Sequence, residues 1–154
     1  MVPQKRGKFT ETKSFMKEYT SSIIKPNLEW LSQLYPELKE NCFDGKNINF
    51  GLIGSLSDNL ITFAEDMSFY DESLKYGNLS MILVSDKMDV QEESIKSNVC
   101  VVHCDDPRQK FFELFSEWTE QIIYPETFIS DKAVIHDSTI VSSKGVFIDD
   151  GVVI

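Results

Sequence analysis

Apolar positions follow three different spacings along the chain. Residues 14–38 place apolar side chains at helical spacing, and Pro26 and Pro36 interrupt the pattern, which predicts two short helices. The middle of the chain predicts strands at 47–54, 59–63, 79–84 and 97–104, a helix over 64–75, and a helix that begins at Pro107 with Asp106 as its cap. Strands that alternate with helices in this order indicate an α/β fold.

The two strands at 79–84 and 97–104 are nearly continuous apolar runs. Such runs are typical of strands covered on both faces, in a parallel or mixed sheet. The helix after Asp106 has one apolar stripe that we expect to pack on that sheet, formed by Phe111, Phe112, Phe115, Trp118 and Ile122.

A six-residue repeat follows Tyr124-Pro125. Its aliphatic positions are Ile129, Ile135 and Val141, then, after one extra residue near 142–145, Ile148 and Ile154. Shorter side chains stand two positions before them, at Ala133, Thr139, Val146 and Val152. This period predicts the opening turns of a left-handed parallel β-helix, with the five aliphatic residues pointing inward from short parallel strands. An irregular β-hairpin is the alternative.

Composition narrows the class of protein. The chain has 154 residues and a net charge of −10, so it suits one domain with a small appendage and disfavours a nucleic-acid binder, which concentrates Lys and Arg along phosphates. We find no apolar run of the roughly 18 to 20 residues that a membrane helix needs, and no secretory signal at the start. We therefore expect a cytoplasmic protein without a membrane span and with reduced cysteines.

Residues that suggest metal or nucleophile chemistry occur at 100–104. Cys100 and Cys104 should face one side of a strand while His103 faces the other, and structural zinc needs four ligands where only Cys42 remains to be added. The same geometry argues against a Cys-His nucleophile. The chain also lacks a glycine-rich phosphate loop of the usual spacing. We predict no metal site and no cofactor.

Four segments, 63–69, 79–84, 105–108 and 133–138, resemble UDP-3-O-acylglucosamine N-acyltransferase of lipid A biosynthesis, and they occur in that family's order. The resemblance covers about 47–154. It implies a small mixed-sheet α/β domain that binds the uridine end of the substrate, followed by a hexapeptide-repeat β-helix that trimerises and carries catalysis. We therefore expect three parts: a helical N-terminal extension at 1–46, a nucleotide-sugar-binding domain at 47–124, and the start of the β-helix at 125–154.

The resemblance also implies a uridine site. An aromatic residue, an Asn and a Tyr of the family fall by position on Phe63, Asp66 and Phe69, with Tyr70 one place further on. Phe63 with Phe69 or Tyr70 would stack on the base. Asp66 departs from the family because a carboxylate accepts hydrogen bonds but does not donate them. The alternative is that the three aromatic residues belong to the core. Arg108 is expected to be a surface residue at a helix start.

The family's catalytic base is a His in later coils, and neither His103 nor His136 matches it. The resemblance thus implies the substrate-recognition part of an enzyme that transfers an acyl group from acyl carrier protein to a UDP-acylglucosamine amine. We predict no catalytic residue here and leave open whether the chain is an enzyme.

The pattern stops in mid-repeat at Ile154, so we expect a truncated, inactive form that is a monomer or weak oligomer, where the full-length family is a homotrimer. One alternative is a hexapeptide-repeat sugar acetyltransferase that uses acetyl-CoA. The other is a non-enzymatic interaction or scaffolding module.

Overall fold

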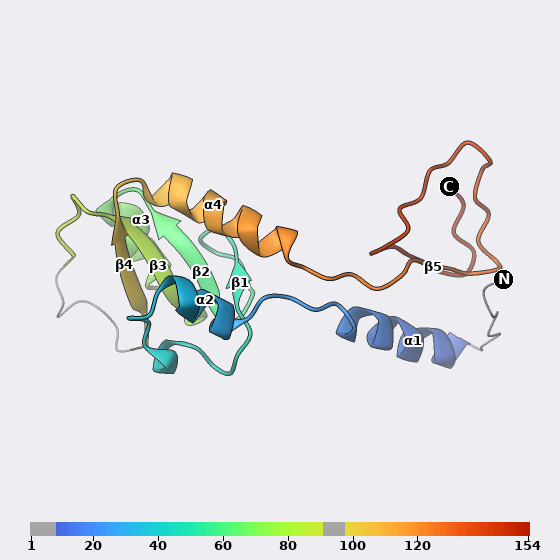
Figure 1. Cartoon of the computed structure of the whole chain (residues 1–154), viewed down its shortest axis with the longest axis horizontal. Helices are drawn as coiled ribbons and strands as arrows, with labels where there is room; N and C mark the ends of the chain where they lie inside the picture. The colour runs from blue at the N-terminus through green and yellow to red at the C-terminus, as the bar shows by residue number, and fades with distance from the viewer. Residues whose placement is uncertain (1–8, 91–97) are drawn as a thin grey trace. The chain divides into compact units, whose positions relative to one another are not determined.

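A computed structural model describes residues 9–90 and 98–154 (Figure 1), so Ser97, the first residue of one predicted strand, lies outside the described residues. The chain forms two compact units. One is Pro26–Gln121, and the other combines residues up to Lys25 with Ile122–Ile154. These boundaries differ from the predicted ones, because the expected extension at 1–46 is divided between the two units. No described helix is long and apolar enough to cross a membrane.

The unit Pro26–Gln121 is built on a four-stranded sheet in the order β1-β2-β3-β4. Its strands are β1 (Asn49–Phe50), β2 (Leu60–Ala64), β3 (Leu79–Ser85) and β4 (Cys100–Cys104). Every neighbouring pair is parallel. The α/β prediction is therefore confirmed, and the mixed sheet is corrected to a parallel one.

Helices cover both faces of this sheet. Tyr70 of α3 (Met67–Ser73) packs with Ala64, Ile82 and Val84 in one core cluster. Successive strand residues point to opposite faces, so Phe63 lies on the other face, where its ring contacts Phe111 of α4 (Pro107–Glu120) at 5.1 Å. Figure 1 shows α4 and α3 on opposite sides of the strands. The apolar run of β3 is buried as predicted because both of its faces are covered.

Helix α4 begins where the sequence predicts. Pro107 is its first residue, and Asp106 Oδ1 accepts a hydrogen bond from the Gln109 backbone N–H at 2.8 Å. The buried face is made of Pro107, Phe111, Leu114 and Trp118. The predicted stripe is therefore shifted, since Phe112 is 48% exposed and Phe115 is also exposed, while Leu114 takes a core position.

The start of this unit matches the second of the two predicted short helices. Helix α2 (Leu28–Leu34) begins after Asn27, whose side chain accepts from the Glu29 backbone N–H. The Trp118 indole donates to the Pro26 carbonyl at 3.0 Å, which ties the entry of α2 to α4. A short 3-10 helix, η1 (Glu40–Cys42), then leads to β1.

The second unit contains the predicted repeat. Strands β5 (Phe128–Ile129) and β6 (Phe147–Ile148) pair in parallel, and an isolated bridge between Val134 and Val153 is also parallel. In each pair the partners are 19 residues apart. Short parallel strands are thus confirmed, and the alternative of an antiparallel hairpin between these two strands is wrong.

The repeat buries its aliphatic positions unequally. Ile148 is only 4% exposed, and Ile135 and Val141 are half-buried, but Ile129 and Ile154 are exposed. The prediction that all five point inward is therefore met fully at Ile148 alone. Ile140, which lies outside the six-residue phase, is 97% exposed, as an outward position should be.

Helix α1 (Phe9–Ser21) belongs to this unit and packs on the repeat. The ring of Phe15 lies 4.6 Å from that of Phe128, and the ring of Tyr19 lies 5.4 Å from that of Phe147. The Tyr19 hydroxyl donates to the Val146 carbonyl at 2.9 Å. These long-range contacts explain why the N-terminal helix joins the C-terminal segment rather than the α/β unit.

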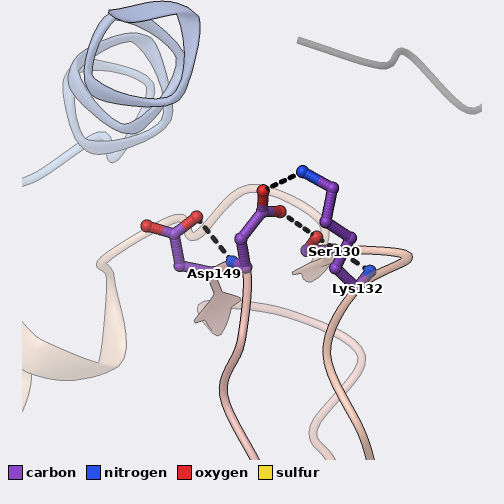
Figure 2. A network of polar contacts seen from close by, with 4 residues as sticks. Ser130, Lys132 and Asp149 are labelled. Carbon is purple, nitrogen blue, oxygen red and sulfur yellow. Dashed lines mark hydrogen bonds and ion pairs between the residues drawn. The ribbon is translucent and has the colours of Figure 1, made fainter. Parts of the chain in front are cut away.

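A polar network fixes one corner of the repeat (Figure 2). The Asp150 carboxylate accepts from Lys132 Nζ at 2.6 Å and from the Ser130 hydroxyl. The Ser130 hydroxyl in turn accepts from the Lys132 backbone N–H at 3.1 Å, and Asp149 accepts from the Asp150 backbone N–H at 2.7 Å. The network joins two turns that are far apart in sequence.

Candidate ligand site at the carboxyl edge of the sheet

The predicted site residues lie at one edge of the parallel sheet. Parallel strands all end at the same edge, and ligands of open α/β sheets bind outside these carboxyl ends. Phe63 is the penultimate residue of β2, and Asp66, Phe69 and Tyr70 belong to the start of α3. The chain therefore places all four within one β-strand-to-helix connection.

Phe63 is a half-buried ring on the α4 side of the sheet. It contacts Phe111 at 5.1 Å and Phe112 at 6.2 Å between ring centroids, both in tilted arrangements. Phe111 is buried, so one side of the Phe63 ring packs against the core of the unit. Phe112 is half exposed and places a second solvent-accessible ring beside Phe63.

Asp66 is exposed and serves as the N-cap of α3. Its Oδ1 accepts a hydrogen bond from the Phe69 backbone N–H at 3.0 Å. This bond satisfies a backbone donor that the helix leaves unpaired, and it restricts the orientation of the Asp66 carboxylate.

Phe69 and Tyr70 have opposite environments. The Phe69 side chain is 51% exposed, whereas Tyr70 is 0% exposed in the core cluster with Ala64 and Val84. Neighbouring residues on a helix point in different directions, and here only the first points toward solvent. The structure therefore places Tyr70 in the core, as the alternative reading held for it, and leaves Phe69 as the ring that a ligand can reach.

The edge is acidic. Carboxylates follow the ends of β2, β3 and β4, at Glu65, Asp66, Asp86, Asp105 and Asp106. Arg108 lies in the first turn of α4 with an exposed side chain, as expected, and its guanidinium is 3.9 Å from Glu65 Oε1. Asp66 and Asp106 each place a negative charge at the start of a helix, which disfavours an anion there.

The cysteines form no catalytic or metal cluster. His103 pairs in register with Val84 on the α3 side of the sheet, so Cys100 and Cys104 face the other side, as predicted. Burial and the neighbouring Cys100 raise the pKa of Cys42 to about 12, and burial raises the pKa of Cys104. High pKa values disfavour the reactive thiolate. Among the described residues, no group of three or more His, Cys, Asp or Glu side chains is placed to hold a metal ion.

One feature of the site, and one contact elsewhere in the unit, were not predicted from the sequence. Phe112 reads as a core residue in the aromatic stripe, but the helix is phased on Pro107, Phe111, Leu114 and Trp118, so Phe112 turns toward solvent. Counting the helical positions from Pro107, the first residue of α4, would have predicted that Phe112 is exposed. The proximity of Cys42 to Cys100 joins η1 to β4 and has no local signal.

Comparisons with protein-family models, with curated proteins and with solved structures find no match to the chain.

Proposed function

We propose that the unit Pro26–Gln121 recognises the nucleobase of a nucleotide sugar, as the substrate-recognition part of a sugar N-acyltransferase like the UDP-3-O-acylglucosamine N-acyltransferases that the sequence resembles. The proposal rests on two aromatic residues of one strand-to-helix connection at the carboxyl edge of a parallel sheet, the half-buried Phe63 and the exposed Phe69, with the exposed Asp66 between them in sequence. Aromatic faces stack on a base without needing specific hydrogen bonds.

The second part of the proposal is that residues 125–154 begin a left-handed parallel β-helix. The constant offset of 19 residues between parallel partners supports it, because a triangular coil of three hexapeptides repeats after 18 residues and this chain has one extra residue near 142–145. Ser142–Gly145 is also where Gly145 adopts a positive φ of 78°, which suits a local insertion in the coil.

The proposal gives the chain a recognition role and no acyl-transfer step. Such a transfer needs a general base near the attacking amine, and His136 Nδ1 instead lies 2.8 Å from the Ser138 hydroxyl in an exposed turn. His103 points to the α3 side of the sheet, away from Phe63. Acyl carrier protein as the donor's carrier and a trimeric assembly remain parts of the resemblance.

Calorimetric titration of the full chain with UDP-N-acetylglucosamine tests the proposal. Stacking a base on an aromatic side chain contributes about 1–3 kcal/mol, so Phe63→Ala should weaken binding by roughly tenfold or more. Phe115→Ala is the matched control, since Phe115 is an exposed ring of α4 that contacts Phe50 and not Phe63, and it should bind like the wild type. Equal binding by wild type and Phe63→Ala, or no binding at millimolar ligand, would contradict the proposal.

A second candidate function is a non-enzymatic assembly module. It is favoured by outward aliphatic side chains of the repeat, namely Val134, Ile140 and Val153, which are exposed. Light scattering distinguishes the two: this candidate predicts a tight oligomer at low micromolar concentration that Ile140→Ser disrupts, whereas nucleotide recognition by the α/β unit alone requires neither.

A further inference from the structure

One side of strand β4 is an unpaired edge of the sheet, and we propose that it pairs with the same strand of a second copy of the chain. The two strands run antiparallel about a two-fold axis and join two four-stranded sheets into one. This inference concerns the assembly of the unit Pro26–Gln121, and it does not depend on the proposed function.

The free side of β4 carries backbone groups without partners. β4 is the last strand in the sheet order, and Figure 1 shows it at the outer side of the sheet. The Asp86 N–H donates to the Cys104 carbonyl at 2.9 Å, so Cys104 and, two residues earlier, Val102 direct their backbone groups toward β3. Successive residues of a strand direct these groups to opposite sides, so those of Val101 and His103 point outward. No described residue forms a hydrogen bond with them across that side.

The edge lacks the features that usually prevent sheets from pairing. Natural edge strands are commonly interrupted by proline, by charged side chains or by bulges. β4 has the sequence Cys-Val-Val-His-Cys, without proline, lysine or a carboxylate, and its register with β3 is regular over five consecutive pairs. Valine also favours the extended backbone. The edge is therefore a regular template for another strand.

Charge at the two ends of β4 favours a second copy in the antiparallel direction. The carboxyl end leads into Asp105 and Asp106, which are exposed. At the amino end the Cys100 thiol donates to the Lys39 carbonyl at 3.6 Å, and the exposed Lys39 side chain forms no ion pair with a described residue. In the antiparallel pair, the Asp105 end of each strand lies beside the Lys39 end of the other. A parallel pair would bring the two acidic ends together.

The outward residues of β4 are self-complementary about Val102. With the two-fold axis at this residue, Val101 of each copy lies opposite His103 of the other, and each of these pairs exchanges two backbone hydrogen bonds. The two Val102 side chains then meet at the axis. The contact is small and each chain has a net charge of −10, so we expect a weak dimer that becomes tighter as salt screens the repulsion.

Sedimentation equilibrium of the full chain at submillimolar concentration tests the proposal. The wild type should form a dimer that tightens at high salt. His103→Pro removes an N–H that the β3–β4 pair does not use, and proline is tolerated in an edge strand at such a position, so the sheet should stay folded. The dimer affinity should fall by about tenfold or more, since two backbone hydrogen bonds are lost, one at each symmetry-related position. Far-UV circular dichroism checks the fold.

His103→Ala is the matched control, because it removes the same side chain and keeps the N–H. It should dimerise like the wild type. A wild type that stays monomeric would overturn the proposal, as would equal dimer affinity in the wild type and His103→Pro. Amide exchange on the wild type gives a second readout that needs no variant. The Val101 and His103 N–H groups should gain protection as the protein concentration rises, and unchanged exchange there would also overturn the proposal.

Discussion

The α/β unit and the unit that contains the repeat bury their apolar side chains to different extents. Within Pro26–Gln121, the strands β2 and β3 are almost wholly buried, and Ile61, Met81, Ile82, Leu83 and Val84 are inaccessible to solvent. Among the described side chains of the other unit, Ile148 is the only hydrophobic residue that is buried. Several aliphatic residues of the repeat are exposed instead: Ile129, Val134, Ile140, Val153 and Ile154.

This contrast follows from architecture. A parallel sheet with a helix layer on each face encloses its own core, so residues on both sides of β3 are covered within one unit. The β-helix proposed for the repeat would bury its inward residues only against coils stacked on it. Helix α1 contacts Phe128 and Phe147 of the repeat, and this packing buries part of the repeat's apolar surface.

The largest expected effect is in the sheet. Ile82→Ala removes a fully buried side chain from the cluster with Tyr70 and Val84, so the free energy of unfolding should fall by about 2–5 kcal/mol. Urea denaturation followed by far-UV circular dichroism measures it. Ile140→Ala, the same change at a 97% exposed position, should shift the free energy by no more than about 0.5 kcal/mol. Similar losses in the two variants would show that the sheet core is not the main source of stability.

A smaller effect is expected for the same substitution in the repeat. Ile148→Ala should lower the free energy of local opening there by about 2 kcal/mol, the lower end of the range, because the surrounding core is thin and can collapse. Hydrogen exchange at the Ser130 and Val134 amides, which donate to the Ile148 and Val152 carbonyls, reports this opening. If sheet amides lose protection as much as these two, the units do not open separately and the contrast fails.

The smallest effect is a pH dependence at the corner of the repeat. Hydrogen bonds from Lys132 and Ser130 hold the pKa of Asp150 below its usual 3.8. A lowered folded-state pKa stabilises the fold above the unfolded value, and this stabilisation is lost as the pH falls below about 3.8 toward the folded value. Protection of the 130–134 amides should therefore drop in acid, and Asp150→Asn should reduce that drop.

Asp137→Asn, at an exposed position in the same segment, is the control and should retain the acid dependence of the wild type. Identical acid profiles for the wild type and Asp150→Asn would show that the ion pair with Lys132 adds nothing to the corner.

Much of the α/β unit can be predicted from the sequence because its signals are local. The run 79–84 and the Asp106-Pro107 pair each determine an element from neighbouring residues, and both elements form as expected. Strand direction is different, since a parallel pair is joined only through a crossover connection, and the sequence left parallel and mixed sheets open.

Contacts between distant segments were beyond the sequence. The pairing of Ile24 with Ile123 and the packing of Phe15 on Phe128 assign α1 to the repeat, and no local pattern encodes them. The candidate site shows the same limit. The sequence suggested Phe63, Asp66, Phe69 and Tyr70 as site residues. Which face of α3 packs on the sheet decides that Phe69 is exposed and Tyr70 is buried, and the sequence alone did not show this.

Hydrogen exchange with and without UDP-N-acetylglucosamine tests most directly that the α/β unit alone forms the ligand site. Peptides that span 60–74 should gain protection at saturating ligand, because the base would contact Phe63, Phe69 and Asp66 around the start of α3. Peptides that span 127–154 should exchange at unchanged rates. Protection that appears in the repeat, or in neither region, would contradict the account.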